Sequence, residues 1–126
     1  MTFVEFIDKG SKFLPRITLN RSGGCSFTAG MFHKYKLNDF VGVKLYFDAA
    51  EKKIGIKLVK EKAEGVFKLS KQAQGKGAYF TAHSFLSSLS IDPKKYAGRY
   101  EPEEVNDPEF GKLFVIQLAE NAKDTS

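Results

Sequence analysis

The chain has 126 residues, enough for one compact domain with a modest core, and 13% of them are aromatic, supplied by twelve Phe and five Tyr. This aromatic content argues against a disordered chain. The single cysteine, Cys25, cannot form an internal disulfide, and no stretch approaches the roughly 18 apolar residues that would span a bilayer. We therefore predict one soluble, cytoplasmic domain over residues 1–126 with no membrane partner.

Positive charge is concentrated in the first half of the chain. The net charge is +5 and the pI is about 9.3. Residues 1–64 hold twelve Lys and Arg against seven Asp and Glu, whereas residues 65–126 hold eight of each. Such a distribution gives one face a field that attracts polyanions. An ordinary solvated lysine surface is the alternative.

The first elements predicted are a β-hairpin and a short helix. Residues 13–19 and 25–27 flank a polar tip that contains glycine, a pattern typical of a hairpin. Thr28 is the expected N-cap of the helix, because its hydroxyl can accept a free backbone N–H of the first turn. Phe27 and Phe32 have the spacing of a hydrophobic staple, which fixes the angle between strand and helix.

A second hairpin is predicted after this helix, which should end near Asn38 or Asp39. Residues 41–47 and 54–59 are two alternating apolar runs joined by a polar segment. Residues 60–65 form a charged connector to the rest of the chain.

The second half repeats this order of elements. Residues 67–70, a glycine turn and Phe80-Thr81-Ala82 match the first hairpin, with Thr81 as the expected cap of a second helix. Asp92-Pro93 is then expected to break the chain. The remaining elements predicted are a strand, an acidic loop, a last strand and a flexible tail, over residues 96–100, 101–111, 113–118 and 121–126.

The chain thus contains an internal repeat, residues 16–60 and 66–119, with the order β-β-α-β-β in each copy. A unit this small cannot bury its own apolar face, so two copies are expected to pack on each other. The predicted fold is mainly β with two short helices (α+β), in which pseudo-twofold copies complete a small closed barrel. This arrangement requires Thr28 and Thr81 to have equivalent structural surroundings, and comparing the two residues tests it.

Residues 17–28, Ile-Thr-Leu-Asn-Arg-Ser-Gly-Gly-Cys-Ser-Phe-Thr, resemble the core pattern of the AbrB-like swapped-hairpin family, which includes MazE antitoxins and MraZ regulators. In that pattern a polar turn holding a glycine joins two strands, and a short helix follows. Gly23 falls on the family glycine, and Thr28 falls where Pro usually starts the helix. MraZ carries two such units in one chain, and this chain looks similar. Gly24 departs from the Arg that the family commonly has, and the second turn is longer by three residues.

The resemblance implies a non-enzymatic, DNA-binding transcription regulator that contacts DNA through the first hairpin of each copy. The residues carried over by position are Arg16, Asn20, Arg21, Lys68, Lys71, Gln72 and Lys76. Lysine and arginine neutralise phosphates, whereas Asn20, Gln72 and Gln74 carry the paired donors and acceptors that read base edges. Ordinary turn and surface residues are the alternative.

Two other functions fit the sequence. Residues 1–12 are expected to form an N-terminal arm or an extra strand. The apolar side chains of this segment, together with that of Phe13, suit a protein-binding or assembly module, as in a viral structural or accessory protein. The residues concerned are Phe3, Phe6, Ile7 and Phe13. The third hypothesis is a single-stranded nucleic-acid binder that stacks bases on Tyr79, Tyr96 or Tyr100.

Neither a metal site nor a catalytic site is predicted. His33 and His83 lie near the starts of the two expected helices without clustered Cys or carboxylate ligands, so we expect both to face solvent. Cys25 is expected to be a small, partly buried strand residue rather than a nucleophile. We accordingly predict no cofactor and no enzymatic activity.

Overall fold

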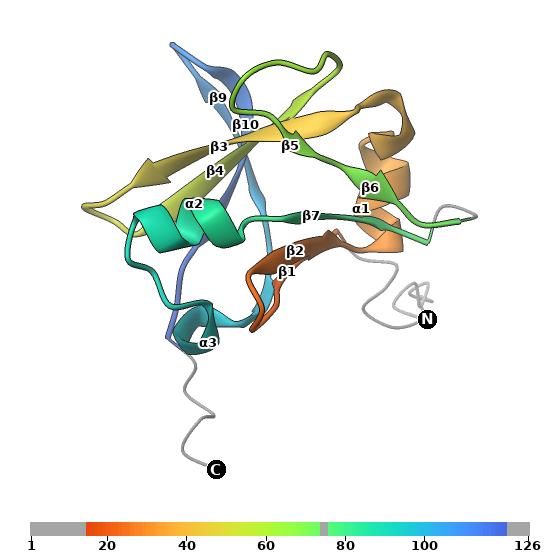
Figure 1. Ribbon diagram of the computed structural model, residues 1–126. Helices are drawn as coiled ribbons and strands as arrows, with labels where there is room; N and C mark the ends of the chain where they lie inside the picture. The colour runs from red at the N-terminus through yellow and green to blue at the C-terminus, as the bar shows by residue number, and fades with distance from the viewer. Residues whose placement is uncertain (1–14, 74–75, 121–126) are drawn as a thin grey trace, which may run out of the picture.

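The computed structural model describes residues 15–73 and 76–120, and they form a mainly β fold with three short α-helices (Figure 1). The predictions for residues 1–14, Gln74 and residues 121–126 lie outside the described part. The α-helices are α1 (Ala29–Lys34), α2 (His83–Ser88) and α3 (Pro93–Tyr96), and a 3-10 helix covers Leu37–Asp39. The strands are β1 (Ile17–Leu19), β2 (Gly24–Phe27), β3 (Gly42–Asp48), β4 (Lys53–Val59), β5 (Phe67–Lys68), β6 (Ser70–Lys71), β7 (Ala78–Thr81), β8 (Gly98–Tyr100), β9 (Glu103–Asp107) and β10 (Gly111–Gln117).

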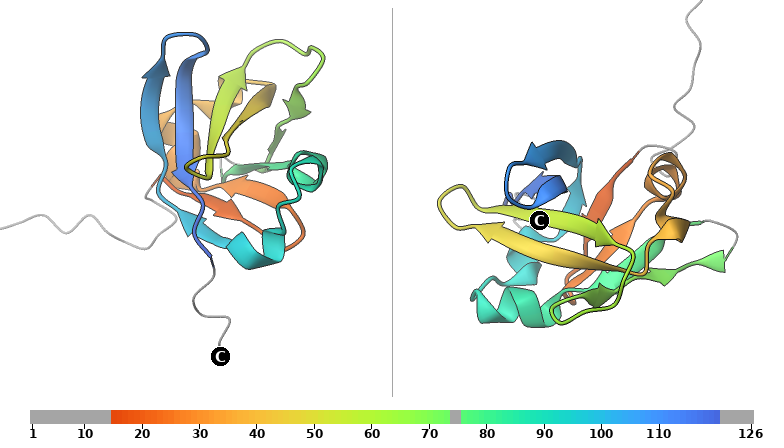
Figure 2. Two further views of the ribbon diagram at one scale, coloured as in Figure 1. Left: turned by 90° about the vertical axis from the view of Figure 1, so that its left-hand side faces the viewer. Right: turned by 90° about the horizontal axis from the view of Figure 1, so that it is seen from above.

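The strands make two antiparallel sheets, so the mainly β prediction is confirmed and the closed barrel is wrong. The first sheet has the order β6-β7-β2-β1-β8 and the second has the order β5-β3-β4-β10-β9. The chain crosses between the sheets three times: through α1 and the 3-10 helix from β2 to β3, at Leu69 from β5 to β6, and at residues 101–102 from β8 to β9. At the crossing between β5 and β6, the N–H of Leu69 donates to Val41 O at 2.9 Å. Figure 2 shows the two sheets from two further sides. Pro102 has no N–H with which to continue a ladder, which favours a corner at the last crossing.

The core lies between the two sheets and is closed at its ends by helices. Alternate residues of each strand point inward, as their period of two requires, so that Ile17, Phe80 and Ile56 are at most 1% exposed. Helices α1 and α2 lie on opposite sides of the molecule (Figure 1) and contribute the buried Met31 and Leu86. None of the helices in residues 15–73 and 76–120 is long and apolar enough to cross a membrane.

The middle of each sheet joins a strand from one predicted copy to a strand from the other. In the first sheet Ser26 of β2 lies opposite Tyr79 of β7, and in the second Gly55 of β4 lies opposite Val115 of β10. On either side of these pairs the strands follow in matching order, β1 next to β2 and β6 next to β7.

The predicted register of the second copy is shifted by two residues. Phe67-Lys68 pairs with β3 in the second sheet, and Ser70-Lys71 takes the place beside β7 that β1 takes beside β2. Seven residues separate Thr18 from Ser26, which it faces, and eight separate Ser70 from Tyr79, so the second turn is one residue longer rather than three. The apolar pattern could not distinguish the two registers, because they differ by one full period of a strand.

The two threonines lie in unlike settings, contrary to the prediction. Thr28 is the N-cap of α1: its Oγ1 accepts a hydrogen bond from Met31 N at 3.3 Å and another from Arg16 N at 3.1 Å. Thr81 instead ends β7 opposite Gly24, and α2 begins at His83 after Ala82, whose side chain makes no cap bond. The backbone N–H of Ala82 donates to Gly23 O at 2.9 Å, so the chain is held by the adjacent turn and not by a threonine cap.

Three further predictions for the second half are wrong. Asp92-Pro93 starts the helix α3, because Asp92 Oδ1 accepts from Lys94 N at 2.9 Å and Pro93 occupies the first turn. The following strand begins at Gly98 rather than Tyr96. The acidic segment expected to be a loop contains the strand β9, which pairs with β10 through a turn held by the Asp107 carboxylate.

Candidate nucleic-acid interface

The residues predicted to bind DNA do not form one site. Asn20 and Arg21 lie at the β1–β2 turn, whereas Lys71, Gln72 and Lys76 lie at the β6–β7 turn. Because β2 and β7 are antiparallel neighbours, these two turns lie at opposite ends of the first sheet (Figure 1). The remaining two predicted residues, Arg16 and Lys68, lie elsewhere.

At least three of the predicted side chains make contacts within the molecule. Asn20 Nδ2 donates to Ser26 Oγ at 3.4 Å, and two of the predicted cations are also engaged. Arg16 donates from Nη1 to Pro15 O at 2.9 Å and lies 3.9 Å from the Glu101 carboxylate, with its side chain 24% exposed. Lys71 Nζ donates to Asn38 O at 2.9 Å. Both contacts limit the reach of these cations toward a phosphate.

A groove lined by lysines runs along the second sheet and the end of α1. It consists of three neighbouring hollows of about 350, 410 and 250 Å³. The first two share Lys57 and Leu58, and the second and third share Ala63 and Val66. We call this the lysine groove, and its lysines are Lys34, Lys36, Lys44, Lys57, Lys60, Lys62, Lys68 and Lys112. Of the predicted residues, only Lys68 belongs to it.

The charge of the lysine groove is largely uncompensated. Lys112 pairs with Glu104 at 2.9 Å, and this contact lowers the pKa of the Glu104 carboxyl through the hydrogen bond and the charge of Lys112. No ion pair joins the other seven lysines to a carboxylate of residues 15–73 or 76–120. Glu61 is the acidic residue among those that line the groove. The arrangement therefore favours an anionic ligand.

Two local features of the lysine groove are unfavourable for the free protein. Lys44 lies directly opposite Lys57 in the β3–β4 pair, and like charges in that position repel. Lys36 has the left-handed backbone conformation, with φ 54° and ψ 53°. Residues other than glycine adopt this conformation at a cost of roughly 1–2 kcal/mol. This turn ends α1 and directs the chain into the 3-10 helix that carries Leu37 into the core.

Aromatic rings line the same groove beneath the ammonium groups. Lys34 and Lys112 Nζ lie 5.4 and 5.5 Å from the ring centroid of Tyr35. Lys60 Nζ lies 5.6 Å from the ring of Phe40. These distances are those of cation–π contacts, which hold a lysine in place without neutralising it.

A second polar surface covers the outer face of the first sheet. The strand registers place one residue from each strand in a row, in the order Ser70, Tyr79, Ser26, Thr18 and Arg99. Tyr79 is 46% exposed and is the most exposed large apolar or aromatic side chain of the described residues. Of the other two tyrosines considered for stacking, Tyr100 donates its hydroxyl to Tyr96 O, and Tyr96 lies beside Lys52.

The two histidines are exposed as predicted, whereas Cys25 is a strand residue that is fully rather than partly buried. Cys25 is 4% exposed, and burial raises the pKa of its thiol to about 12, so it is a core residue. His33 and His83 are exposed on α1 and α2. The described residues contain no cluster of three or more His, Cys, Asp or Glu able to hold a metal ion.

Sequence reasoning missed the lysine groove because its members come from separate elements. Their signal was the basic excess of residues 1–64, which includes six of the eight lysines. The pairing of β3 with β4 and β5, and of β4 with β10, brings the strand lysines into one sheet. Comparison with protein-family models, curated proteins and solved structures finds no match to this chain.

Proposed function

We propose that this protein is a non-enzymatic DNA-binding protein that holds the phosphate backbone of DNA in the lysine groove. The observation that carries the proposal is the continuous set of eight lysines, of which one is paired with a carboxylate of the described residues. Each lysine placed against a phosphate releases a condensed counterion, which supplies affinity at low salt. Repulsion between Lys44 and Lys57 is relieved when an anion lies between them.

The chemistry of the groove supports binding that depends little on DNA sequence. Every cation of the lysine groove is a lysine, which acts on phosphate as a point charge, whereas paired contacts to guanine are typical of arginine. Sequence discrimination, and with it a regulatory role of the AbrB-like type, would depend on side chains outside the groove, such as Asn20 and Gln72. Phosphate contacts position a protein on DNA, and base contacts specify the site.

A duplicated, AbrB-like arrangement of the chain is part of this proposal. Its support is the strand order, in which β2 meets β7 and β4 meets β10 at the centre of each sheet. The unlike settings of Thr28 and Thr81 count against a strict repeat. The groove proposal does not depend on this relation, because it rests on charge and position alone.

Three variants with equal charge change separate the groove from the other basic regions. Lys44→Gln/Lys57→Gln alters the groove, Arg21→Gln/Lys76→Gln alters the two predicted hairpin tips, and Lys94→Gln/Lys95→Gln alters α3. Fluorescence anisotropy with a labelled duplex at low salt measures the dissociation constant of each. We expect a loss of at least tenfold for the groove variant and less than threefold for the α3 control. Equal losses for all three variants would leave only a net-charge effect and defeat the proposal.

A second candidate function, binding of single-stranded nucleic acid, is favoured by the exposure of Tyr79. Its ring lies on an open sheet face in one row with Arg99, and base stacking on an aromatic side chain contributes about 1–3 kcal/mol. Tyr79→Ala should weaken binding to a single strand and leave duplex binding unchanged. If the variant binds both as the unaltered protein does, the tyrosine face has no part in binding.

A further inference from the structure

A hollow of about 550 Å³ lies away from the lysine groove, between the β3–β4 turn, the α2–α3 segment and the end of β10. Its apolar lining comes from Phe47, Leu89, Ile91 and Leu118. Leu89 is 37% exposed, although most large apolar side chains of the described residues are buried. The exposed lining as a whole is mixed, with more polar than apolar surface, so both apolar side chains and polar groups are open to a ligand.

Cationic and hydroxyl groups stand at the rim of this hollow. Lys52 Nζ lies 3.5 Å from the Tyr96 hydroxyl and 6.0 Å from the centroid of its ring. Lys95, also at the rim, lies 3.8 Å from the Glu120 carboxylate, and both side chains are more than 60% exposed, so that pair is weak. Lys52 forms no ion pair with a carboxylate in the described part of the chain.

The one carboxylate of the lining is already engaged. Asp92 Oδ1 accepts a hydrogen bond from the backbone N–H of Lys94 at 2.9 Å, as the cap of α3. The rim therefore has two cations, of which Lys52 is free to meet an anion, and the balance of charge suits a monoanion.

The backbone of the lining is held in a restricted conformation. Lys52 and Ser90 have positive φ angles of 54° and 57°, and they are two of the three residues other than glycine for which the structure gives this conformation. Such residues persist only where the surroundings fix them, and they gather at ligand sites.

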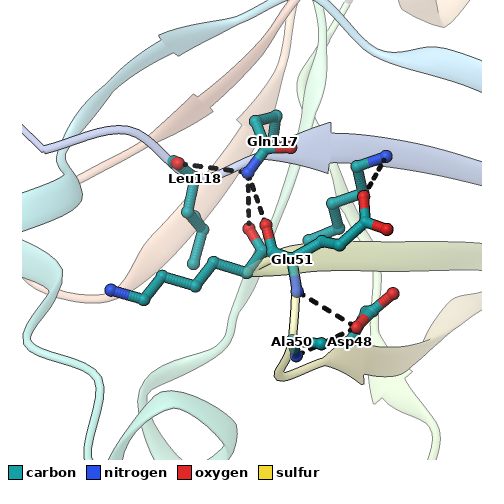
Figure 3. Close-up of polar contacts among 7 residues, drawn as sticks. Asp48, Ala50, Glu51, Gln117 and Leu118 are labelled. Atoms are coloured by element: carbon teal, nitrogen blue, oxygen red, sulfur yellow. Dashed lines mark hydrogen bonds and ion pairs between the residues drawn. The ribbon is translucent and has the colours of Figure 1, made fainter.

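Hydrogen bonds from the last strand fix the turn that carries Lys52. Gln117 Nε2 donates to Glu51 O at 2.6 Å and to Lys52 O at 3.3 Å (Figure 3). Leu118 N donates to Lys52 O at 2.9 Å. These bonds join the backbone of the turn to the end of β10, which places the Cα atom of Lys52 at the rim before any ligand arrives.

We infer that this hollow binds a small amphipathic carboxylate, with the carboxylate at Lys52 and the Tyr96 hydroxyl and the apolar body against Leu89 and Ile91. Charge complementarity at the rim selects the anion, and the exposed apolar lining selects a hydrocarbon or aryl body. The inference is independent of the proposed DNA binding, since no lysine of the groove lines this hollow.

Titration with decanoate below its micelle concentration tests the site, with decan-1-ol as a probe of equal length and no charge. Amide chemical shifts in a nitrogen-15 correlation spectrum report the location. We expect saturable shifts at residues 89–92 and 96 with decanoate, and at least tenfold weaker binding of decan-1-ol. Lys52→Gln should lower the decanoate affinity at least fivefold, whereas Lys53→Gln, whose lysine pairs with Glu51 at 3.1 Å, should leave it unchanged.

A second variant distinguishes a loss of binding at the hollow from an effect of Lys52→Gln on folding. Leu89→Ser should lower the affinity for decanoate while the variant keeps a cooperative melting transition, since the Leu89 side chain is partly exposed. Equal affinity for decanoate and decan-1-ol, equal effects of Lys52→Gln and Lys53→Gln, or shifts spread outside the hollow would each overturn the inference.

Discussion

Ser26 and Tyr79 face each other at the centre of the first sheet. On either side of this pair, the residue before Ser26 faces the residue after Tyr79, and the reverse: Cys25 faces Phe80 and Phe27 faces Ala78. The predicted repeat makes Phe27 equivalent to Phe80, and therefore Ser26 equivalent to Tyr79. A pair of equivalent residues that face each other is the geometry expected where an axis passes between two antiparallel strands. Gly55 and Val115 have the same relation in the second sheet, since Ile54 faces Ile116 and Ile56 faces Phe114.

The predicted equivalence of Phe27 and Phe80 leads us to expect that replacing either one destabilises the protein by a similar amount. Their rings lie 5.6 Å apart between centroids, and the two side chains are 3% and 1% exposed. Replacing either phenylalanine by alanine removes a buried ring and leaves a cavity, so we expect each change to lower the free energy of unfolding by about 3–5 kcal/mol. Urea denaturation followed by circular dichroism measures the change.

Tyr79→Ala is the matched control for this prediction, because Tyr79 lies on the outer face of the same strand pair. Its loss should not exceed about 1 kcal/mol, the span of strand propensities. The assignment of inner and outer faces would be wrong if Phe80→Ala cost no more than Tyr79→Ala.

The two threonines predict a clear difference between variants that the sequence alone treats as equal. Thr28→Ala removes the cap of α1 and the acceptor for Arg16 N, and should lower the free energy of unfolding by about 0.5–2 kcal/mol. Thr81→Ala changes an exposed residue without a capping role and should stay within about 0.5 kcal/mol. The same denaturation measurement compares them, and equal losses would restore the predicted equivalence of the two caps.

Local features of the structure could be predicted from the sequence, and long-range contacts could not. The hairpins and the Thr28 cap follow from alternation and from residues adjacent in the chain, and they are present. The same kind of signal was misjudged at Asp92-Pro93, because Asp followed by Pro is typical both of a helix start and of a chain break. The partner of residues 67–68 depends on which sheet has a free edge, and no local pattern contains that information.

For the candidate site too, the local signal could be read from the sequence and the long-range contacts could not. The basic excess of the first half predicted a polyanion-binding face, but the family resemblance directed attention to the hairpin tips. Lys57 and Lys112 are 55 residues apart in the sequence and line one hollow, because β4 and β10 pair in the second sheet. A site assembled by strand pairing cannot be located before the pairing is known.

Burial of Cys25 predicts a thiol that stays unreactive in the folded protein. The pKa of the thiol is about 12 when folded and 9.0 in its ordinary state, so the reactive thiolate is scarce between pH 7 and 9 in the folded chain. The unfolded chain loses this proton first as the pH rises, so the contribution of Cys25 to stability is present below pH 9 and decreases above it. Absorbance with a disulfide reagent measures the labelling rate.

Labelling in denaturant provides the control for this measurement. The unfolded chain should react completely and faster with rising pH, whereas the folded chain should react slowly with little change up to pH 9. Rapid labelling of the folded protein at pH 7 would show that Cys25 is accessible and contradict the burial of β2 in the core.

Repulsion within the lysine groove predicts that one substitution changes stability and binding in opposite directions. Lys44 faces Lys57 across β3 and β4, and Lys44→Gln removes the repulsion while keeping a long polar side chain. We expect the free energy of unfolding to rise by about 0.2–1 kcal/mol at low salt. The gain should fade as salt is added, since screening weakens the repulsion in the unaltered protein.

The same variant should bind duplex DNA more weakly, because one phosphate contact is lost. Each contact contributes about 0.9 to the slope of the logarithm of affinity against the logarithm of salt concentration, so the slope should become shallower by about that amount. Lys94→Gln removes a lysine of α3 outside the groove and should change neither stability nor slope. If Lys44→Gln lowered stability, or left the slope unchanged while binding weakened, the lysines of β3 and β4 would serve the fold and not a polyanion.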